Sequence, residues 1–282
     1  MQFIDRSDKT IGSYRKALCD FELWLWDKKE ISDITIISFK EIKEYREILI
    51  NDYAPASLNL KLCAIKSFYK YLFQQEFINS DPSEHIKIQK VSDNIKSQYL
   101  TRGEELRIMS QAKSNGKKTY AILMIMLKCG LRPSEVSKLT LNSIFLRDDP
   151  TLIVKNSKRN KSRYVPIPAD TVLAIQEWLE IREKSNNIIH LQSNYLFTSQ
   201  RAASMGERAI QRVIERLAKK VNIKLYCTRL RCSYANNLIQ EAKIPVNILS
   251  NLLGHENLST TSRYLTASMH DVRKYVNKLS EI

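Results

Sequence analysis

The sequence predicts a mainly α-helical fold with one small β-hairpin, divided between two domains. Apolar residues recur at helical spacing along most of the chain, and two short β-like runs flank one basic turn. The 282 residues exceed the roughly 100 to 200 residues of one ordinary domain. A hydrophobic content of 43% is sufficient for packed cores, so we expect a folded protein rather than a disordered one.

The first domain, residues 1–90, is expected to be helical. Helical periodicity covers residues 10–26 and 57–73, and Pro55 suits the first turn of the second helix, where its missing N–H is not needed. The apolar stripe of that helix consists of Leu58, Leu62, Ile65, Tyr69 and Leu72.

Three lysines, Lys61, Lys66 and Lys70, lie off this stripe and give the helix a basic flank. A solvated surface is the favoured interpretation of these lysines, and a phosphate contact is the alternative. We keep Lys61 and Lys66 as candidate DNA contacts.

Residues 91–98 are expected to form a linker, because periodicity fades there and turn residues and lysines follow one another. The second domain, residues 99–282, then starts with a helix at Thr101. Residues 119–128 are apolar on nearly all sides, which predicts a buried central helix. Gly130 suits the position after its end, and Pro133 suits the first turn of a short helix.

Residues 151–167 predict a β-hairpin with a strongly basic tip. The runs 152–154 and 164–167 are β-like, and five cations without an intervening acid crowd between and beside them. Such like charges repel unless a partner neutralises them, so we expect a phosphate or nucleic-acid contact here. The cations are Lys155, Lys158, Arg159, Lys161 and Arg163.

Further helices are expected over residues 170–183, 206–221, 234–241, 245–253 and from Ser259 onward. The helix 206–221 has one apolar face and a second face where Arg208, Arg212, Arg216 and Lys220 recur every four residues. This row is either a phosphate track or a solvated face, and Arg212 and Arg216 are our candidate DNA contacts.

The formal charge of +15 and the sequence pI of about 9.5 favour a polyanionic partner. The sequence contains no transmembrane run and no signal peptide, so we expect a cytoplasmic protein without a membrane partner. Its five cysteines and four histidines lack metal-binding spacing, so we expect reduced thiols, no metal and no cofactor.

Four segments become informative through their order in the chain. They contain, in turn, an arginine box, the basic hairpin, a Leu-Arg box and a Leu-Gly-His box followed by a tyrosine. This order resembles the tyrosine recombinase (phage integrase-like, Xer-type) family. The matching residues are Gly130-Leu-Arg-Pro-Ser-Glu135, Lys158-Arg-Asn-Lys-Ser-Arg163-Tyr-Val-Pro-Ile167, Leu230-Arg231, and Leu253-Gly-His255 with Thr260-Thr261 and Tyr264; Ala64 to Leu72 resembles the family's core-binding domain.

The resemblance implies a metal-free cleavage of DNA in which Tyr264 attacks the phosphodiester and forms a 3′-phosphotyrosine. Arg132 and Arg231 would stabilise the charge of the transition state, with His255 on a phosphate oxygen. Lys158 would protonate the departing 5′ hydroxyl, with Lys161 as the rival for that role. Glu135 would orient this cluster, although it could also be an ordinary acid at a helix N-terminus.

The chain departs from the family pattern at two positions. Thr228 stands where the family usually has histidine, and its hydroxyl can donate to phosphate but cannot act as an acid or base near neutral pH. Arg159 replaces the usual glycine of the hairpin turn. These changes bear on proton transfer and on the rate of turnover.

The resemblance further implies a two-domain clamp around double-stranded DNA, acting as a homotetramer on two short inverted-repeat core sites and passing through a Holliday junction. Residues 269–279 have helical spacing, and this tail either packs on its own core or docks on a neighbouring protomer.

Site-specific recombination is the leading function, in dimer resolution, cointegrate resolution or the integration and excision of a mobile element; Thr228 slightly favours a mobile-element enzyme such as a transposon resolvase. Accessory DNA sites or proteins are possible partners. The alternatives are a type IB topoisomerase-like enzyme and a catalytically weak DNA-binding regulator.

Overall fold

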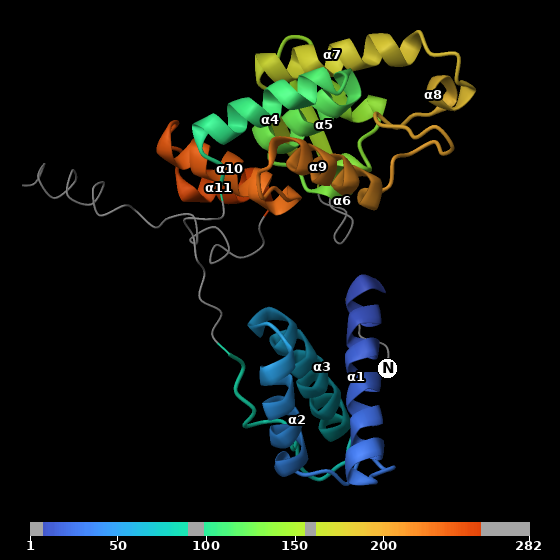
Figure 1. The fold of residues 1–282 in the computed structure, drawn as a ribbon, viewed down its shortest axis with the longest axis vertical. Helices are drawn as coiled ribbons and strands as arrows, with labels where there is room; N and C mark the ends of the chain where they lie inside the picture. The colour runs from blue at the N-terminus through green and yellow to red at the C-terminus, as the bar shows by residue number, and fades with distance from the viewer. Residues whose placement is uncertain (1–7, 90–98, 156–161, 255–282) are drawn as a thin grey trace, which may run out of the picture. The chain divides into compact units, whose positions relative to one another are not determined.

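The computed structural model describes residues 8–89, 99–155 and 162–254 (Figure 1). Contacts divide the chain into two compact units, residues 1–93 and 94–282, called here the N-terminal and C-terminal units. The described part is mainly helical and contains one small three-stranded sheet, which confirms the predicted fold class.

The N-terminal unit has three helices in its described part: α1 (Asp8–Lys29), α2 (Phe39–Asp52) and α3 (Pro55–Gln74). Helices α1 and α3 pack side by side (Figure 1), and α2 covers both. Pro55 is the first residue of α3, as predicted, and a capping box formed by Ser38 and Glu41 starts α2. The core contains the predicted stripe of α3, in which Leu58, Leu62, Ile65 and Tyr69 are fully buried.

The C-terminal unit is built around α5 (Lys117–Lys128), the predicted central helix. All residues from Ala121 to Leu127 are buried. Helix α5 packs against α4 (Arg102–Ser114), α7 (Ala169–Glu183) and α10 (Cys227–Gln240). Thr101 caps α4 with Glu104 in a capping box, so the predicted start at Thr101 is confirmed.

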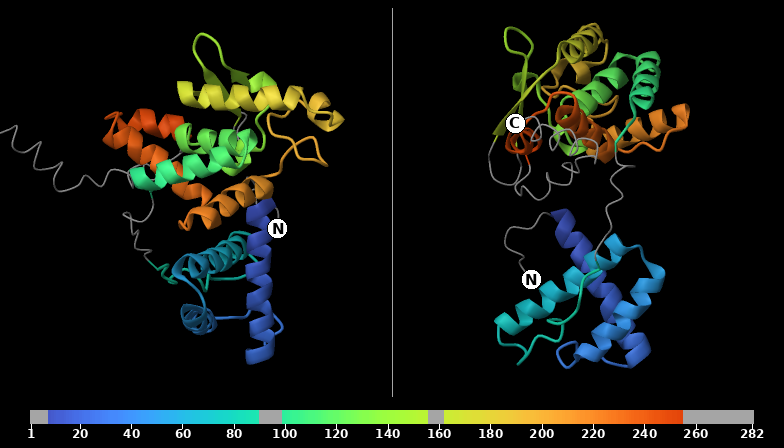
Figure 2. Two further views of the ribbon diagram at one scale, coloured as in Figure 1. Left: turned by 45° about the horizontal axis from the view of Figure 1, so that its top comes forward. Right: turned by 90° about the vertical axis from the view of Figure 1, so that its left-hand side faces the viewer.

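The sheet has the order β1-β2-β3 and is antiparallel throughout. Strands β2 (Thr151–Lys155) and β3 (Ser162–Pro166) are the predicted hairpin, with Val154 opposite Arg163. Strand β1 (Ile144–Phe145) was not predicted, because two residues are too few for a periodic signal. In both views of Figure 2 the sheet lies at the edge of the C-terminal unit.

The remaining elements are short helices and two amphipathic ones. They are α6 (Pro133–Val136), the 3₁₀ turn η2 (Leu141–Ser143), α8 (Ile188–Gln192), α9 (Glu207–Val221) and α11 (Val246–Leu253). The prediction that a helix starts at Tyr234 is wrong by seven residues, since α10 already begins at Cys227. The first residues of α10 are mostly polar and show no apolar periodicity, so the start was missed, although Leu230 and Arg231 there are buried.

Candidate active site and DNA-binding surface

The first arginine box lies where α5 ends and α6 begins. Helix α5 ends at Lys128, and Gly130 then takes a φ of 67°, in the left-handed region that glycine adopts without strain. A Cβ at this position would lie 2.3 Å from the Tyr234 ring, so only glycine fits beneath α10. The chain then runs through buried Leu131 to Arg132, which is extended and precedes Pro133 at the start of α6.

Glu135 is the centre of the candidate site, because three arginines surround its carboxylate. The Arg163 guanidinium reaches both oxygens, with Nη1 2.8 Å from Oε1 and Nη2 2.9 Å from Oε2. Arg132 donates its backbone N–H to Oε2 at 2.8 Å and Nη1 to Oε1 at 3.2 Å. Nη1 of Arg231 lies 3.9 Å from Oε2. Glu135 therefore links residues from α6, β3 and α10.

Arg231 projects from α10 into the interior, and its side chain is only 7% exposed. Its two terminal nitrogens donate to the backbone carbonyls of Gly130 and Leu253. Arg132, by contrast, has 42% of its side chain exposed. The site thus combines a buried, carbonyl-anchored guanidinium with an accessible one.

The Glu135 carboxyl is held ionised by its neighbours. Burial raises its pKa, but the hydrogen bond and charge of Arg163, the Arg132 N–H and the charge of Arg231 together outweigh burial, so the net pKa is lowered. This anion surrounded by cations matches an orienting role for Glu135 better than a proton-transfer role.

Only some of the other predicted site residues lie within the described ranges. Thr228 is exposed in the first turn of α10, and Lys155 is exposed at the end of β2. Lys158, Arg159, Lys161, His255, Tyr264 and the C-terminal tail lie outside the described residues.

The predicted basic flank of α3 needs a correction. Lys61 is buried, not solvated: it forms an ion pair with Asp20 of α1, and its ammonium lies 4.8 Å from the centre of the Tyr53 ring. Lys66 donates to the backbone carbonyls of Glu84 and Ile86 at 2.8 and 3.0 Å. Both lysines thus hold parts of the N-terminal unit together.

The basic face of α9 is exposed at Arg212 and Arg216. Its opposite face, formed by Ile210, Val213, Ile214 and Leu217, is buried in the core. Helix α9 packs against α6, which Arg132 immediately precedes. Arg208 is engaged by Glu215 at 2.7 Å, and Lys220 donates to Asn115 at 2.7 Å. Among the four cations of the predicted row, this leaves Arg212 and Arg216 as the ones best suited to a phosphate.

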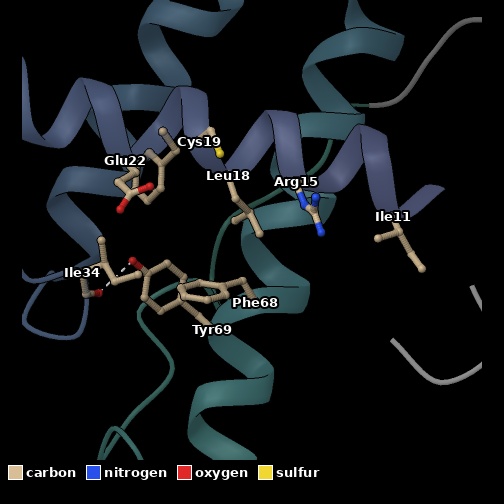
Figure 3. Close-up of a pocket in the computed structure, with 9 residues that line it drawn as sticks. Ile11, Arg15, Leu18, Cys19, Glu22, Ile34, Phe68 and Tyr69 are labelled. Atoms are coloured by element: carbon tan, nitrogen blue, oxygen red, sulfur yellow. Dashed lines mark hydrogen bonds between the residues drawn. The ribbon is translucent and has the colours of Figure 1, made fainter. Parts of the chain in front are cut away.

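The N-terminal unit also has a pocket of about 320 Å³, which the sequence did not indicate (Figure 3). It lies between α1 and the second half of α3, and among its lining residues Tyr69 donates its hydroxyl to the Ile34 carbonyl at 2.9 Å. Its lining is mostly apolar: Ile11, Arg15, Leu18, Cys19, Phe21, Glu22, Ile34, Phe68 and Tyr69.

The described ranges contain neither a candidate metal site nor a candidate membrane span. Within them, no three His, Cys, Asp or Glu side chains gather where they could hold a metal ion. No helix of those ranges has both the length and the apolar character needed to cross a membrane.

Comparison with known proteins gives two family matches. The phage integrase family matches residues 98–271, and the N-terminal SAM-like domain of phage integrases matches residues 1–79. Tyrosine recombinase XerC of Caldanaerobacter subterraneus subsp. tengcongensis is 26% identical, over 97% of this chain and 82% of the relative. Tyrosine recombinase XerA of Thermococcus kodakarensis is 28% identical, over 81% of this chain and 77% of the relative.

Solved structures of similar fold include two with DNA. The Tn1549 transposon integrase in complex with transposon right end DNA has a TM-score of 0.81 at 18% identity, over 99% of this chain and 96% of that one. The XerH site-specific recombinase bound to its difH substrate has a TM-score of 0.75 at 19% identity, over 94% and 78%. At these low identities, the similarity shows that the fold is shared.

Proposed function

Because the chain belongs to the phage integrase family, we propose that it is a site-specific DNA recombinase that cleaves and rejoins duplex DNA through a 3′-phosphotyrosine. The observation that carries this proposal is the convergence of Arg132 and Arg231 on one carboxylate from separate elements. The partly exposed Arg132 can donate to a non-bridging oxygen of a phosphate, and Arg231 adds a second positive charge at the same carboxylate.

The chemistry needs a nucleophile that conserves the bond energy for rejoining, and by its motif Tyr264 fills that role. The phenol oxygen forms a bond to phosphorus while the bond to the 5′ oxygen breaks. Lys158 supplies the proton to that oxygen, and rejoining reverses both steps. Ionising a tyrosine of pKa near 10 at neutral pH costs about 4 kcal/mol, so nearby cations and His255 must share that cost.

DNA affinity would come mainly from phosphate contacts. Arg212 and Arg216 on the exposed face of α9, with Lys155 and the basic hairpin tip, supply the cations on the C-terminal unit. Such contacts position the duplex without reading its sequence, and binding weakens steeply with salt. The DNA in the Tn1549 integrase and XerH structures supports a duplex substrate.

We further propose that the protein acts as a homotetramer on two inverted-repeat core sites and passes through a Holliday junction. In this assembly the C-terminal tail docks on a neighbouring protomer. Deleting residues 268–282 should leave binding to a single site intact and abolish synapsis. Unchanged recombination by the truncated protein would refute tail exchange.

The cleavage proposal is tested with nicked duplexes tiled across the DNA that flanks the coding sequence, because a nick near the cleavage point traps the covalent intermediate. We expect a denaturant-resistant protein–DNA adduct on one short inverted repeat, and none with Tyr264→Phe. Adducts on every fragment would favour a topoisomerase-like enzyme. Binding without an adduct would favour a regulator, and Thr228→His would then be the variant to examine.

A further inference from the structure

Arg163 is the one arginine of the Glu135 cluster that the cleavage chemistry does not use. Its side chain is 15% exposed and lies in β3, at the base of the hairpin. Besides both oxygens of Glu135, it reaches α11, where its Nε donates to the Leu252 carbonyl at 2.8 Å. Three of its nitrogens are therefore committed to protein acceptors, which does not fit the expected DNA contact.

The distances show how the charge of Glu135 is shared. Arg163 forms a two-pronged pair at 2.8 and 2.9 Å, the geometry in which a guanidinium binds a carboxylate most strongly. Through its side chain, Arg132 has one longer contact at 3.2 Å to a single oxygen. The carboxylate is thus balanced mainly from β3, and 42% of the Arg132 side chain is exposed.

We infer that Arg163 is a positioning residue: by occupying Glu135 it keeps this carboxylate from drawing Arg132 away from the substrate phosphate. The inference rests on the proposed cleavage function and deepens it.

Removing Arg163 would leave the Glu135 carboxylate, whose side chain is only 12% exposed, with one strong partner fewer. The guanidinium best placed to replace Arg163 is that of Arg132, whose Nη1 already lies 3.2 Å from Oε1. A paired Arg132 would have less charge and fewer donors for phosphate, and the cleavage step would slow more than DNA binding would weaken. If Glu135 is neutral, Arg163 is no longer needed for this purpose.

The experiment measures single-turnover adduct formation on the nicked cognate site, with the dissociation constant measured separately. Arg163→Met should slow cleavage by about 10- to 100-fold, as small misplacements of catalytic groups do, and change the dissociation constant less than about 3-fold. Arg163→Lys, which retains the charge but lacks the two-pronged geometry, should be intermediate. Arg201→Met, which removes an exposed loop arginine, is the control and should cleave at the wild-type rate.

The decisive variant is Glu135→Gln combined with Arg163→Met. We expect its cleavage rate to be within about 3-fold of Glu135→Gln alone, because the competing charge is gone. The inference would be overturned if Arg163→Met lowered the cleavage rate by the same factor in the wild-type protein and in the Glu135→Gln variant, because a purely structural arginine would be needed in both backgrounds.

A stability measurement tests the same idea without cleavage. The coupling between Arg132→Met and Glu135→Gln, measured as the unfolding free energy of the C-terminal unit from exchange of the α5 amides, should increase when Arg163 is already methionine. Where Arg163→Met does not fold, Arg163→Lys takes its place in this measurement. A coupling that stays unchanged would overturn the inference. Absence of an adduct from the wild-type protein would instead refute the proposed function, and the coupling would still decide the role of Arg163.

Discussion

Replacing Gly130 by alanine should destabilise the C-terminal unit far more than an ordinary glycine substitution. A residue with a side chain in the left-handed region loses about 1–2 kcal/mol. The added Cβ would also lie 2.3 Å from Cδ1 and 2.7 Å from Cε1 of Tyr234, a ring held in α10 that cannot move aside alone. Overpacking of this kind costs typically about 1–3 kcal/mol, so we expect a total loss of about 2–5 kcal/mol.

The substitution should also affect the site, because the Gly130 carbonyl accepts a hydrogen bond from Arg231. Relief of the Tyr234 contact requires either this peptide or α10 to shift. Either movement displaces the Arg231 guanidinium, so cleavage should be impaired under conditions where the variant is still folded.

Gly254→Ala is the matched control. Gly254 has a similar φ of 61°, but a Cβ there would lie 3.1 Å from its nearest neighbour, Nη1 of Arg163, which is tight contact and not the severe overlap found at Gly130. Gly254→Ala should therefore lose about 1–2 kcal/mol, mainly from backbone strain. Gly103→Ala, where a Cβ in α4 would meet nothing within 4 Å, should be neutral or slightly stabilising.

The assay is hydrogen–deuterium exchange of the α5 amides, supported by urea unfolding followed by circular dichroism. Exchange of α5 reports on the C-terminal unit itself, whereas a global signal combines two units that need not unfold together. Equal losses for Gly130→Ala and Gly254→Ala would refute the argument, because the contact with Tyr234 would then contribute nothing.

Three further predictions concern charges. Asp20→Asn should destabilise the N-terminal unit by about 1–3 kcal/mol in thermal unfolding, because buried Lys61 loses its partner, whereas Lys61→Met should cost less than about 1 kcal/mol; equal losses would contradict this. Arg212→Gln and Arg216→Gln should each lower DNA affinity and reduce the slope of log affinity against log salt by about 1, measured by fluorescence anisotropy; an unchanged slope would exclude a phosphate contact. Glu135 has a lowered pKa when folded, so its stabilisation is present above its unfolded pKa and is lost as pH falls through the folded value. Between pH 6 and 3 the wild type should therefore lose more unfolding free energy than Glu135→Gln, and parallel losses would contradict the pairing.

Local sequence signals predicted the elements whose residues are strongly patterned. The apolar run of α5, Pro55 at the start of α3 and the capping residue Thr101 each impose a local preference that the fold follows. The first turn of α10 was missed because Arg231 appears polar in any periodic pattern. It is buried only because Gly130 and Leu253, far away in the chain, provide carbonyls for it.

Contacts between distant residues also limited what could be predicted of the candidate site. The order of the boxes identified Arg132, Glu135 and Arg231 without any knowledge of distances. It could not show that Arg163 belongs with them, since a basic residue in a basic hairpin looks like every other cation there. Likewise, Lys61 appeared solvated because its partner, Asp20, is 41 residues away on another helix.

Under the proposed cleavage function, the two arginines of the site have opposite requirements. A guanidinium that must stabilise a transition state should be preorganised, and Arg231 achieves this through burial and two carbonyl acceptors. A guanidinium that must admit a bulky DNA phosphate has to remain accessible, as Arg132 is. An accessible arginine next to a carboxylate would readily pair with it and lose its use for substrate. Placing a third arginine on β3, outside the reacting centre, allows Glu135 to order the backbone of Arg132 through its N–H while much of the Arg132 side chain remains accessible.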